Sequence, residues 1–318
     1  MNGSEALHVV FGANGGLGQA VVRQLAEQGK RVRAVTRSGQ AAAPPGVELA
    51  QADARDPAAA RQASADADVI YHAINVPYDR WPEILPPIME NLIAAAASAN
   101  ARMVYGDNLY MYGKVEGPLH EDLPYRPAGK KGQLRAGLAD RLIAAHKEGK
   151  VQAAIGRASD FVGPGATNTI TGLLVIEPIL KGKKAMWIGS LDAPHTISYI
   201  DDVARGLIIL AEHDRAYGEV WHIPASEPLT GRQFIEMVCE QAERQACDVG
   251  VYKRTAMRLV SVISPMAREA LENLYQFEQP FVLDGSKFEG AFGPFETTPH
   301  REAIGATIDW YRSRGIFG

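Results

Sequence analysis

A glycine-rich segment near the start of the chain has the residue types needed to hold a phosphate. The segment Gly12–Gly18 follows a short apolar run and precedes an amphipathic one. In such a place, successive glycines permit a tight turn, let the backbone approach a pyrophosphate, and let a helix pack on a strand. The N–H groups at the helix start add a partial positive charge. No Lys-Ser or Lys-Thr closes the segment, which excludes a P-loop. We interpret it as a dinucleotide-binding loop, the alternative being a plain turn. Its predicted cofactor contacts are Gly12, Asn14, Gly15, Gly16, Leu17 and Gly18.

The next strand-like run ends in a basic residue where many dinucleotide sites have an acid. Arg37 and Ser38 stand directly after Thr36, and no carboxylate accompanies them. A carboxylate at this place holds the ribose diol of NAD, whereas an arginine accommodates the 2′-phosphate of NADP. Arg37 can form two hydrogen bonds with a phosphate, and Ser38 can donate another. The sequence therefore favours NADP (or NADPH) over NAD as cofactor. The alternative is that Arg37 is a solvated charge at a strand end.

Alternating apolar patterns predict the elements that must position these residues. Predicted strands cover residues 7–11, 31–36, 47–52, 68–72, 101–105 and 151–156, and predicted helices cover 15–29, 87–100 and the region of 134–142. Because helices separate the strands, we expect a parallel sheet with helices on both faces, a Rossmann-type doubly wound α/β fold. Further on, Thr230 and Gln233 form a capping-box pattern at the start of a helix, and 303–314 is an amphipathic helix.

The length of 318 residues allows two domains at ~150 residues each. We expect an NADP-binding Rossmann domain over residues 1–160, to which 196–223 returns. A smaller mixed α/β substrate-binding lobe is expected from 161–195 and 224–318.

Composition and charge restrict the class of protein. Hydrophobic residues make up 46% and charged residues 22% of the chain, a globular composition. The formal net charge of −4 argues against a nucleic acid or an anionic membrane as partner. No apolar run reaches ~18 residues, so we expect no membrane span. Residues 1–5 lack the features of a signal peptide, and a cytoplasmic protein is expected.

The chain has two cysteines, Cys239 and Cys247. We expect both to lie in one helix, in which eight residues at ~1.5 Å each separate them by roughly 12 Å. That distance is too long for a disulfide. The sequence therefore predicts two reduced thiols, which fits the cytoplasm.

Taken together, these features resemble the extended short-chain dehydrogenase/reductase family, which includes the nucleoside-diphosphate-sugar epimerases and dehydratases. The resemblance covers nearly the whole chain, and Gly12, Gly15 and Gly18 match the family's Gly-x-x-Gly-x-x-Gly. Further landmarks follow in the family's order: Asp53, Met111-Tyr112-Gly113, Glu121-Asp122, Arg157, Gly163-Pro164 and 199–204. The resemblance implies a nicotinamide-dependent enzyme. It also implies that Asp53 binds the adenine amino group, with Ala54, Ala73 and Lys131 as further cofactor contacts.

The sequence departs from the family at the catalytic positions. Lys131 stands in the place of the family's tyrosine and Arg135 in that of its lysine, while Asn108 replaces a serine or threonine. We therefore expect an atypical member without the usual Tyr-x-x-x-Lys pair. Asn108 would polarise a substrate oxygen and Lys131 would exchange a proton, with Arg135 orienting the cofactor or favouring proton loss from Lys131. Tyr110 is a further candidate donor. The alternative is that both cations face solvent and are inert.

Substrate-binding residues are predicted from the segments that form the family's cleft. They are Trp81, Asp107, Asp160, Phe161 and His195. His195 stands where the family has an arginine that grips a sugar-nucleotide pyrophosphate, so a small, mostly apolar substrate suits the aromatic residues better. The eight histidines show no metal-ligand spacing, and no metal is predicted.

Three hypotheses about function remain open. The first is an NADP(H)-dependent oxidoreductase that transfers a hydride to or from a carbonyl, a hydroxyl or an activated double bond. The second is a catalytically inactive NADP(H)-binding redox sensor, and the third is a sugar-nucleotide epimerase or dehydratase with altered catalytic groups. The expected partner is a small-molecule substrate, and the expected state is a monomer or homodimer.

Overall fold

The computed structural model describes residues 6–262 and 271–315. The chain forms two compact units, each assembled from three segments. Unit 1 comprises Met1–Asp107, Leu134–Arg157 and Val203–Ile223, and unit 2 comprises Asn108–Gln133, Ala158–Asp202 and Pro224–Gly318. Three segments expected in the Rossmann domain belong to unit 2, namely Asn108–Gln133, 158–160 and 196–202.

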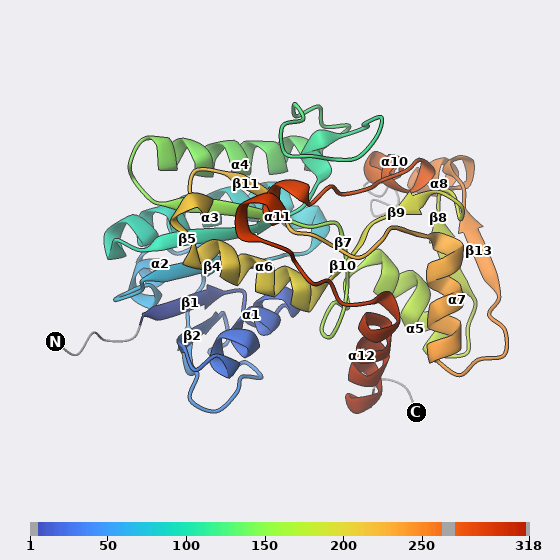
Figure 1. Ribbon diagram of the computed structural model, residues 1–318, viewed down its shortest axis with the longest axis horizontal. Coiled ribbons are helices and arrows are strands. Elements are labelled where there is room, and N and C mark those ends of the chain that lie inside the picture. Colours follow the sequence, from blue (N-terminus) through green and yellow to red (C-terminus); the bar gives the residue numbers. More distant parts are fainter. Residues whose placement is uncertain (1–5, 263–270, 316–318) are drawn as a thin grey trace. The chain divides into compact units, whose positions relative to one another are not determined.

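Unit 1 contains a seven-stranded parallel sheet in the order β11-β6-β5-β4-β1-β2-β3 (Figure 1). The strands are β1 (Leu7–Phe11), β2 (Arg31–Thr36), β3 (Glu48–Gln51), β4 (Val69–His72), β5 (Arg102–Asp107), β6 (Ala153–Arg157) and β11 (Val220–His222). The connecting helices are α1 (Gly16–Glu27), α2 (Pro57–Ala63), α3 (Trp81–Ala99), α4 (Lys130–Lys147) and α6 (Ile200–Glu212), with short helical turns η1 (Tyr78–Arg80) and η4 (Asp214–Ala216). The predicted doubly wound α/β fold is confirmed.

The strand order of unit 1 changes direction at β1, which lies between β2 and β4. All five residues of β1 and all five of β6 are buried, as expected for inner strands of a parallel sheet. Ligands of such sheets bind at the carboxyl ends of the strands, where the order changes direction. Helix α3 begins at Trp81, earlier than predicted, and continues through Pro86 and Pro87. Each of these prolines lacks the N–H that would donate to the carbonyl oxygen four residues earlier, so the helix forgoes two backbone hydrogen bonds in its second turn.

Unit 2 is built from three two-stranded sheets and several helices. The strand pairs are β7 (Asp160–Val162) with β10 (Ile197–Tyr199), β9 (Pro194–His195) with β12 (Leu229–Thr230), and β8 (Ala185–Ile188) with β13 (Val249–Tyr252). The helical elements are η2 (Tyr110–Tyr112), the π-helix η3 (Thr171–Ile176), α5 (Glu177–Leu180), α7 (Gly231–Gln241), α8 (Arg254–Ser261), α10 (Tyr275–Glu278), α11 (Ser286–Phe292) and α12 (His300–Ser313). This mixture of short strands and helices agrees with the mixed α/β character predicted for this part of the chain, but unit 2 is not the smaller of the two units.

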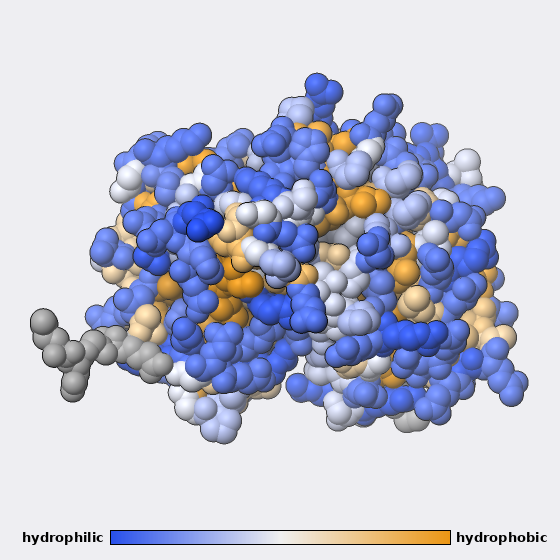
Figure 2. Space-filling view, viewed as in Figure 1, coloured by the Kyte–Doolittle hydropathy of each residue, from blue (hydrophilic) through white to orange (hydrophobic). Residues whose placement is uncertain are grey.

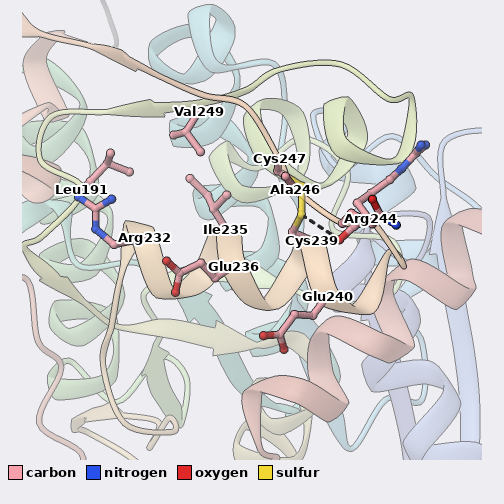
Figure 3. A pocket seen from close by; sticks show the side chains of 11 residues that line it. Leu191, Arg232, Ile235, Glu236, Cys239, Glu240, Arg244, Ala246, Cys247 and Val249 are labelled. Atoms are coloured by element: carbon pink, nitrogen blue, oxygen red, sulfur yellow. Dashed lines mark hydrogen bonds between the residues drawn. A yellow bond between two sulfur atoms is a disulfide. The ribbon is translucent and has the colours of Figure 1, made fainter.

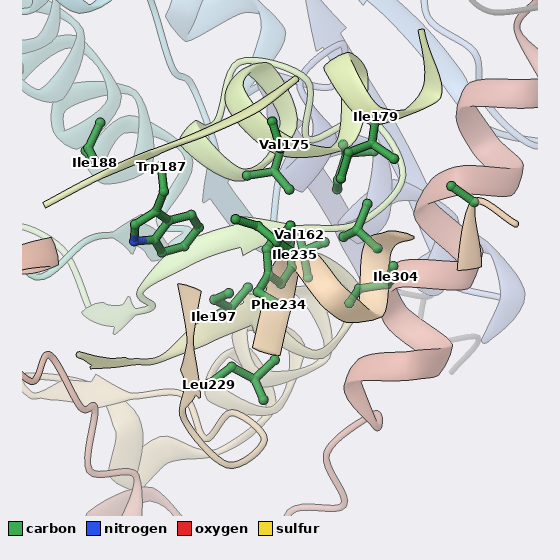
Figure 4. Close-up of a cluster of buried hydrophobic side chains, with 14 of the residues drawn as sticks. Val162, Val175, Ile179, Trp187, Ile188, Ile197, Leu229, Phe234, Ile235 and Ile304 are labelled. Carbon is green, nitrogen blue, oxygen red and sulfur yellow. The ribbon is translucent and has the colours of Figure 1, made fainter. Parts of the chain in front are cut away.

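A buried apolar cluster holds unit 2 together (Figure 4). Trp187 of β8 is 1% exposed and contacts Phe234 of α7 and Phe277 of α10. The predicted capping box is confirmed, because the Thr230 side chain accepts the N–H of Gln233 and the Gln233 side chain accepts the N–H of Thr230. The capping box fixes Thr230 as the residue before the first turn of α7, and this start places Phe234 on the buried side of the helix.

The prediction of two reduced cysteines is wrong, because the structure joins Cys239 and Cys247 in a disulfide. Their Cα atoms are 6.1 Å apart, not the 12 Å of a continuous helix. Helix α7 ends at Gln241, and Glu243 then adopts a left-handed φ of 59° that turns the chain back. The second cysteine therefore lies in the segment before β13, beside the end of the helix.

Hydrophilic side chains cover most of the face shown in Figure 2, with smaller apolar areas among them. In the described part of the chain, no helix combines the length and apolar character needed to cross a membrane.

Candidate functional site

The predicted dinucleotide loop lies between β1 and α1, at the carboxyl edge of the sheet in unit 1. Gly12 has a φ of +89°, and a Cβ there would stand 2.6 Å from the carbonyl oxygen of Ala73. A Cβ on Gly18 would stand 2.2 Å from the carbonyl oxygen of Gly12. The N–H of Gly15 donates to that same oxygen, at 2.9 Å, and closes the turn. The loop therefore fits a dinucleotide pyrophosphate, since its close backbone packing requires glycine at these positions.

The first residues of α1 suit a phosphate electrostatically. The helix has twelve residues and no acidic residue in its first turn, so the positive end of its dipole is not opposed there. Asn14 and Gly15 are exposed, while Gly16 and Leu17 are half-buried. These four predicted cofactor contacts lie together in one turn.

Two arginines lie around one carboxylate at the ends of β2 and β3. The strands are neighbours, and Thr36 pairs with Gln51, so Arg37 and Asp53 both follow the same edge. Arg55 donates from Nε to both carboxylate oxygens of Asp53, at 3.0 Å each. These hydrogen bonds, together with the charges of Arg55 and Arg37, lower the pKa of Asp53 below its ordinary value.

Ser38 and Ala54 complete this edge. Ser38 is exposed, and its hydroxyl donates to the carbonyl oxygen of Gln40 at 3.3 Å. Ala54 is buried, and its carbonyl oxygen accepts a hydrogen bond from Asn91 of α3. That bond fixes the segment that carries Asp53 and Arg55.

A buried charged cluster occupies the ends of β5 and β6 in unit 1. Asp107 ends β5, and one of its oxygens lies 3.3 Å from Nη1 of Arg135, while the other lies 3.3 Å from Nε of Arg157. The side chains of Asp107 and Arg157 are 0% exposed and that of Arg135 is 7% exposed. One carboxylate therefore faces two guanidinium groups away from water. Each of these buried charges is stabilised by the others, so removing one of them is costly.

Aromatic and imidazole rings enclose the Arg135 end of this cluster. The guanidinium carbon lies 4.1 Å from the ring centre of Trp81, a cation–π contact. Nη1 of Arg135 also donates to the hydroxyl of Tyr105 at 2.5 Å. Burial raises the pKa of Tyr105 above its ordinary value. The ring of His72 packs on Tyr105, and burial, with the charge of Arg135, lowers the pKa of His72 to about 3.

The structure shows that the catalytic candidates are buried or half-buried. Lys131 is 4% exposed and Arg135 6% exposed, so the alternative that both cations face solvent is wrong. Asn108 uses its side-chain oxygen to accept the N–H of Tyr110, at 3.1 Å. Gly132, beside Lys131, packs on the backbone of Tyr110, since a Cβ there would be 2.5 Å from its carbonyl oxygen. Within unit 2, the start of α4 and the turn η2 therefore lie against one another.

The substrate-side candidates of unit 2 form a second cluster. Nε2 of His195 lies 2.8 Å from a carboxylate oxygen of Asp160, and Nδ1 lies 3.1 Å from the carbonyl oxygen of Gln276. The imidazole is 2% exposed and stacks on Phe277 and Phe281. Both ring nitrogens of His195 therefore have protein partners. Phe161, next to Asp160, is half-buried.

Among the arginines of these clusters, Arg157 and Arg55 were not predicted as site residues. Arg157 was noted only as a landmark of the family, and its position at the end of a strand was the available signal. Arg55 follows Asp53 by two residues, a spacing at which the side chains of a turn can meet. Asp107, Trp81 and Arg135 were predicted separately, and the structure brings them together.

A family model and one relative match most of the chain. The chain matches the NAD dependent epimerase/dehydratase family over residues 8–223. It is 27% identical to the uncharacterized protein y4nL of Sinorhizobium fredii, over 92% of this chain and 88% of that protein.

Solved structures share the fold. The dTDP-glucose 4,6-dehydratase DesIV of Streptomyces venezuelae, solved with NAD and TYD bound, has a TM-score of 0.81 at 20% identity, covering 98% of this chain and 99% of that one. A UDP-glucose 4-epimerase of Thermus thermophilus, in complex with NAD, has a TM-score of 0.78 at 18% identity, covering 96% and 99%.

Proposed function

The chain belongs to the NAD dependent epimerase/dehydratase family of nicotinamide-dependent enzymes, and from this premise we propose that it is an NADP(H)-dependent oxidoreductase. It would transfer a hydride to or from a small, mostly apolar carbonyl, hydroxyl or activated double-bond substrate. The feature of the chain that fits the dinucleotide is the close backbone packing at Gly12 and Gly18, where a Cβ would have no room.

The observation that carries the NADP preference is the charge at the ends of β2 and β3. Arg37 and Arg55 surround Asp53, and no acid follows β2 directly. Two guanidinium groups and one carboxylate leave one net positive charge at the edge where the adenosine ribose of a dinucleotide binds. A 2′-phosphate would be attracted there, whereas a ribose diol lacks its usual carboxylate acceptor. Arg55 is thus added to Arg37 as a proposed phosphate ligand.

The catalytic proposal uses the buried cations in different ways. The nicotinamide cofactor, when bound, supplies or accepts the hydride. Lys131 would donate or accept the proton at the substrate oxygen, and the Asn108 side chain has N–H groups that can polarise that oxygen. Arg135, held by Asp107 and stacked on Trp81, would orient the cofactor or substrate. Tyr110 stays a proposed proton donor, and Asp160, Phe161 and His195 stay proposed substrate contacts.

The relatives support a second candidate, a sugar-nucleotide epimerase or dehydratase, because two similar structures bear those names. This candidate requires a group that holds a pyrophosphate. His195, proposed at that position, has both ring nitrogens engaged, which favours the first proposal. An inactive NADP(H)-binding sensor stays a third candidate. The cytoplasmic location, and a monomer or homodimer as the assembly, also stay predictions.

The test is a paired titration of the protein with NADPH and NADH, followed by cofactor fluorescence. We expect NADPH to bind at least ~10-fold more tightly, a difference of about 1.4 kcal/mol. Arg37→Ala and Arg55→Ala should each reduce that preference, while Arg31→Ala, at the opposite end of β2, should not. Equal or tighter NADH binding would refute the NADP assignment and favour the epimerase or dehydratase. If neither binds, the cofactor-dependent proposal fails altogether.

A further inference from the structure

A pocket of about 400 Å³ in unit 2 has the disulfide in its wall (Figure 3). It lies between the exposed side of α7 and the segment that leads into β13. Cys239 comes from the last turn of the helix, and Cys247 from that segment. Both line the pocket, so a small molecule entering it meets the bridge.

We propose that this pocket is a thiol–disulfide exchange site for a small zwitterionic thiol. A thiolate of that class attacks one sulfur of the bridge, the S–S bond breaks, and a mixed disulfide forms. A second thiolate attacks the mixed disulfide and releases the oxidised small molecule. Two external thiols supply the two electrons, and the two cysteines take up the protons. Low-molecular-weight disulfides drive the reverse reaction.

The charges around the pocket suit a ligand that carries both signs. Its lining includes Arg232 and Arg244 as well as Glu236 and Glu240. Arg232 is paired with Asp192, and Glu240 with Arg301. Arg244 and Glu236 are therefore the lining charges that a ligand with a carboxylate and an ammonium group can engage. A purely apolar or singly charged thiol would use only part of this lining.

The environment of Cys239 also accommodates the reduced state. Its sulfur lies 3.6 Å from the carbonyl oxygen of Arg244. A thiol has a hydrogen to donate to that oxygen, which a disulfide sulfur does not have. Reduction therefore gives the freed sulfur of Cys239 a nearby hydrogen-bond acceptor.

The disulfide lies between α7 and β13, and both of these elements are neighbours of Trp187. Helix α7 carries Phe234, whose ring centre lies 6.3 Å from that of Trp187. Strand β13 pairs with β8, and Val251 of β13 lies opposite Trp187 of β8. Opening the bridge releases the segment between α7 and β13, so the environment of Trp187 should change with the redox state.

The experiment treats the full chain, purified without reductant, with glutathione and counts free thiols with a chromogenic disulfide reagent. We expect no free thiol before treatment and two after it, with a change in tryptophan fluorescence. The Cys239→Ser/Cys247→Ser variant should show no such fluorescence change. Arg244→Ala should slow reduction by glutathione by about 2- to 5-fold, the effect of one exposed charge. It should leave reduction by the uncharged thiol 2-mercaptoethanol unaltered.

Arg312→Ala, on the exposed side of α12, is the matched control and should change neither rate. Two free thiols in the untreated protein would overturn the proposal. Reduction that requires unfolding would also overturn it, because the pocket would then give no access. Equal effects of Arg244→Ala on both thiols would contradict the recognition of charge. None of these outcomes depends on cofactor binding.

Discussion

Replacing Asp107 by asparagine removes the carboxylate that faces Arg135 and Arg157 in the buried cluster of unit 1. The side chains of Asp107 and Arg157 are 0% exposed and both ion pairs measure 3.3 Å, so water cannot replace the lost charge without opening the fold. Breaking a buried ion pair by removing one partner costs about 3–5 kcal/mol. Against a total stability of about 5–15 kcal/mol, this is a large loss. At about 2–4 °C per kcal/mol, we expect Asp107→Asn to lower the melting temperature by about 6–20 °C.

Equilibrium unfolding in urea and thermal unfolding by circular dichroism measure this effect. Asp53→Asn is the control, because it breaks an ion pair of the same residue types whose side chains are 33% and 47% exposed. An exposed pair contributes about 0–1 kcal/mol. Adding Arg135→Met to Asp107→Asn should recover part of the loss, since it removes one of the two positive charges that faced the lost carboxylate. If Asp107→Asn costs no more than Asp53→Asn, the buried cluster does not stabilise the fold as argued.

Two further predictions concern single residues of unit 1. Because burial lowers the pKa of His72 from 6.5 to about 3, the unfolded chain binds a proton in this interval and the folded chain does not. The folding stability that comes from keeping the ring neutral is fully present above pH 6.5 and is lost as the pH falls toward 3. At pH 5 the loss is about 2 kcal/mol. Unfolding free energies measured against pH should be flatter for His72→Gln, and an unchanged slope would contradict the neutral ring. Gly18→Ala, whose Cβ would lie 2.2 Å from a carbonyl oxygen, should abolish dinucleotide binding. Gly137→Ala, with no atom within 4 Å of its Cβ, should retain binding and gain up to about 1 kcal/mol in stability. Fluorescence titration and thermal unfolding test both, and binding by Gly18→Ala would refute the close-packing argument.

Local sequence order was enough to predict the doubly wound fold and the glycine loop. The five-residue apolar run of β1, the loop that follows it and the helix α1 are continuous in the chain, and the roles of the glycines depend mostly on this local arrangement. The capping box of Thr230 and Gln233 was predicted for the same reason, since its two partners are three residues apart.

The cysteines show how a small error in a local boundary changes a chemical conclusion. Extending α7 beyond Gln241 placed Cys239 and Cys247 far apart, whereas the left-handed residue Glu243 reverses the chain and brings them together. A positive φ at a residue other than glycine is uncommon, so the sequence offered no clear signal of that turn.

The sequence by itself determined the order of strands and helices, the glycine cradle and the basic end of β2, because these depend on residues close together in the chain. Only the tertiary structure decided which charges meet. Asp107 lies 28 residues from Arg135 and 50 from Arg157, and their contact exists because parallel strands β5 and β6 end side by side under α4. Likewise, the enclosure of His195 by two phenylalanine rings depends on chain segments about 80 residues apart. Burial then decides whether such side chains act as free groups or as fixed partners, since away from water every charge needs a neighbour.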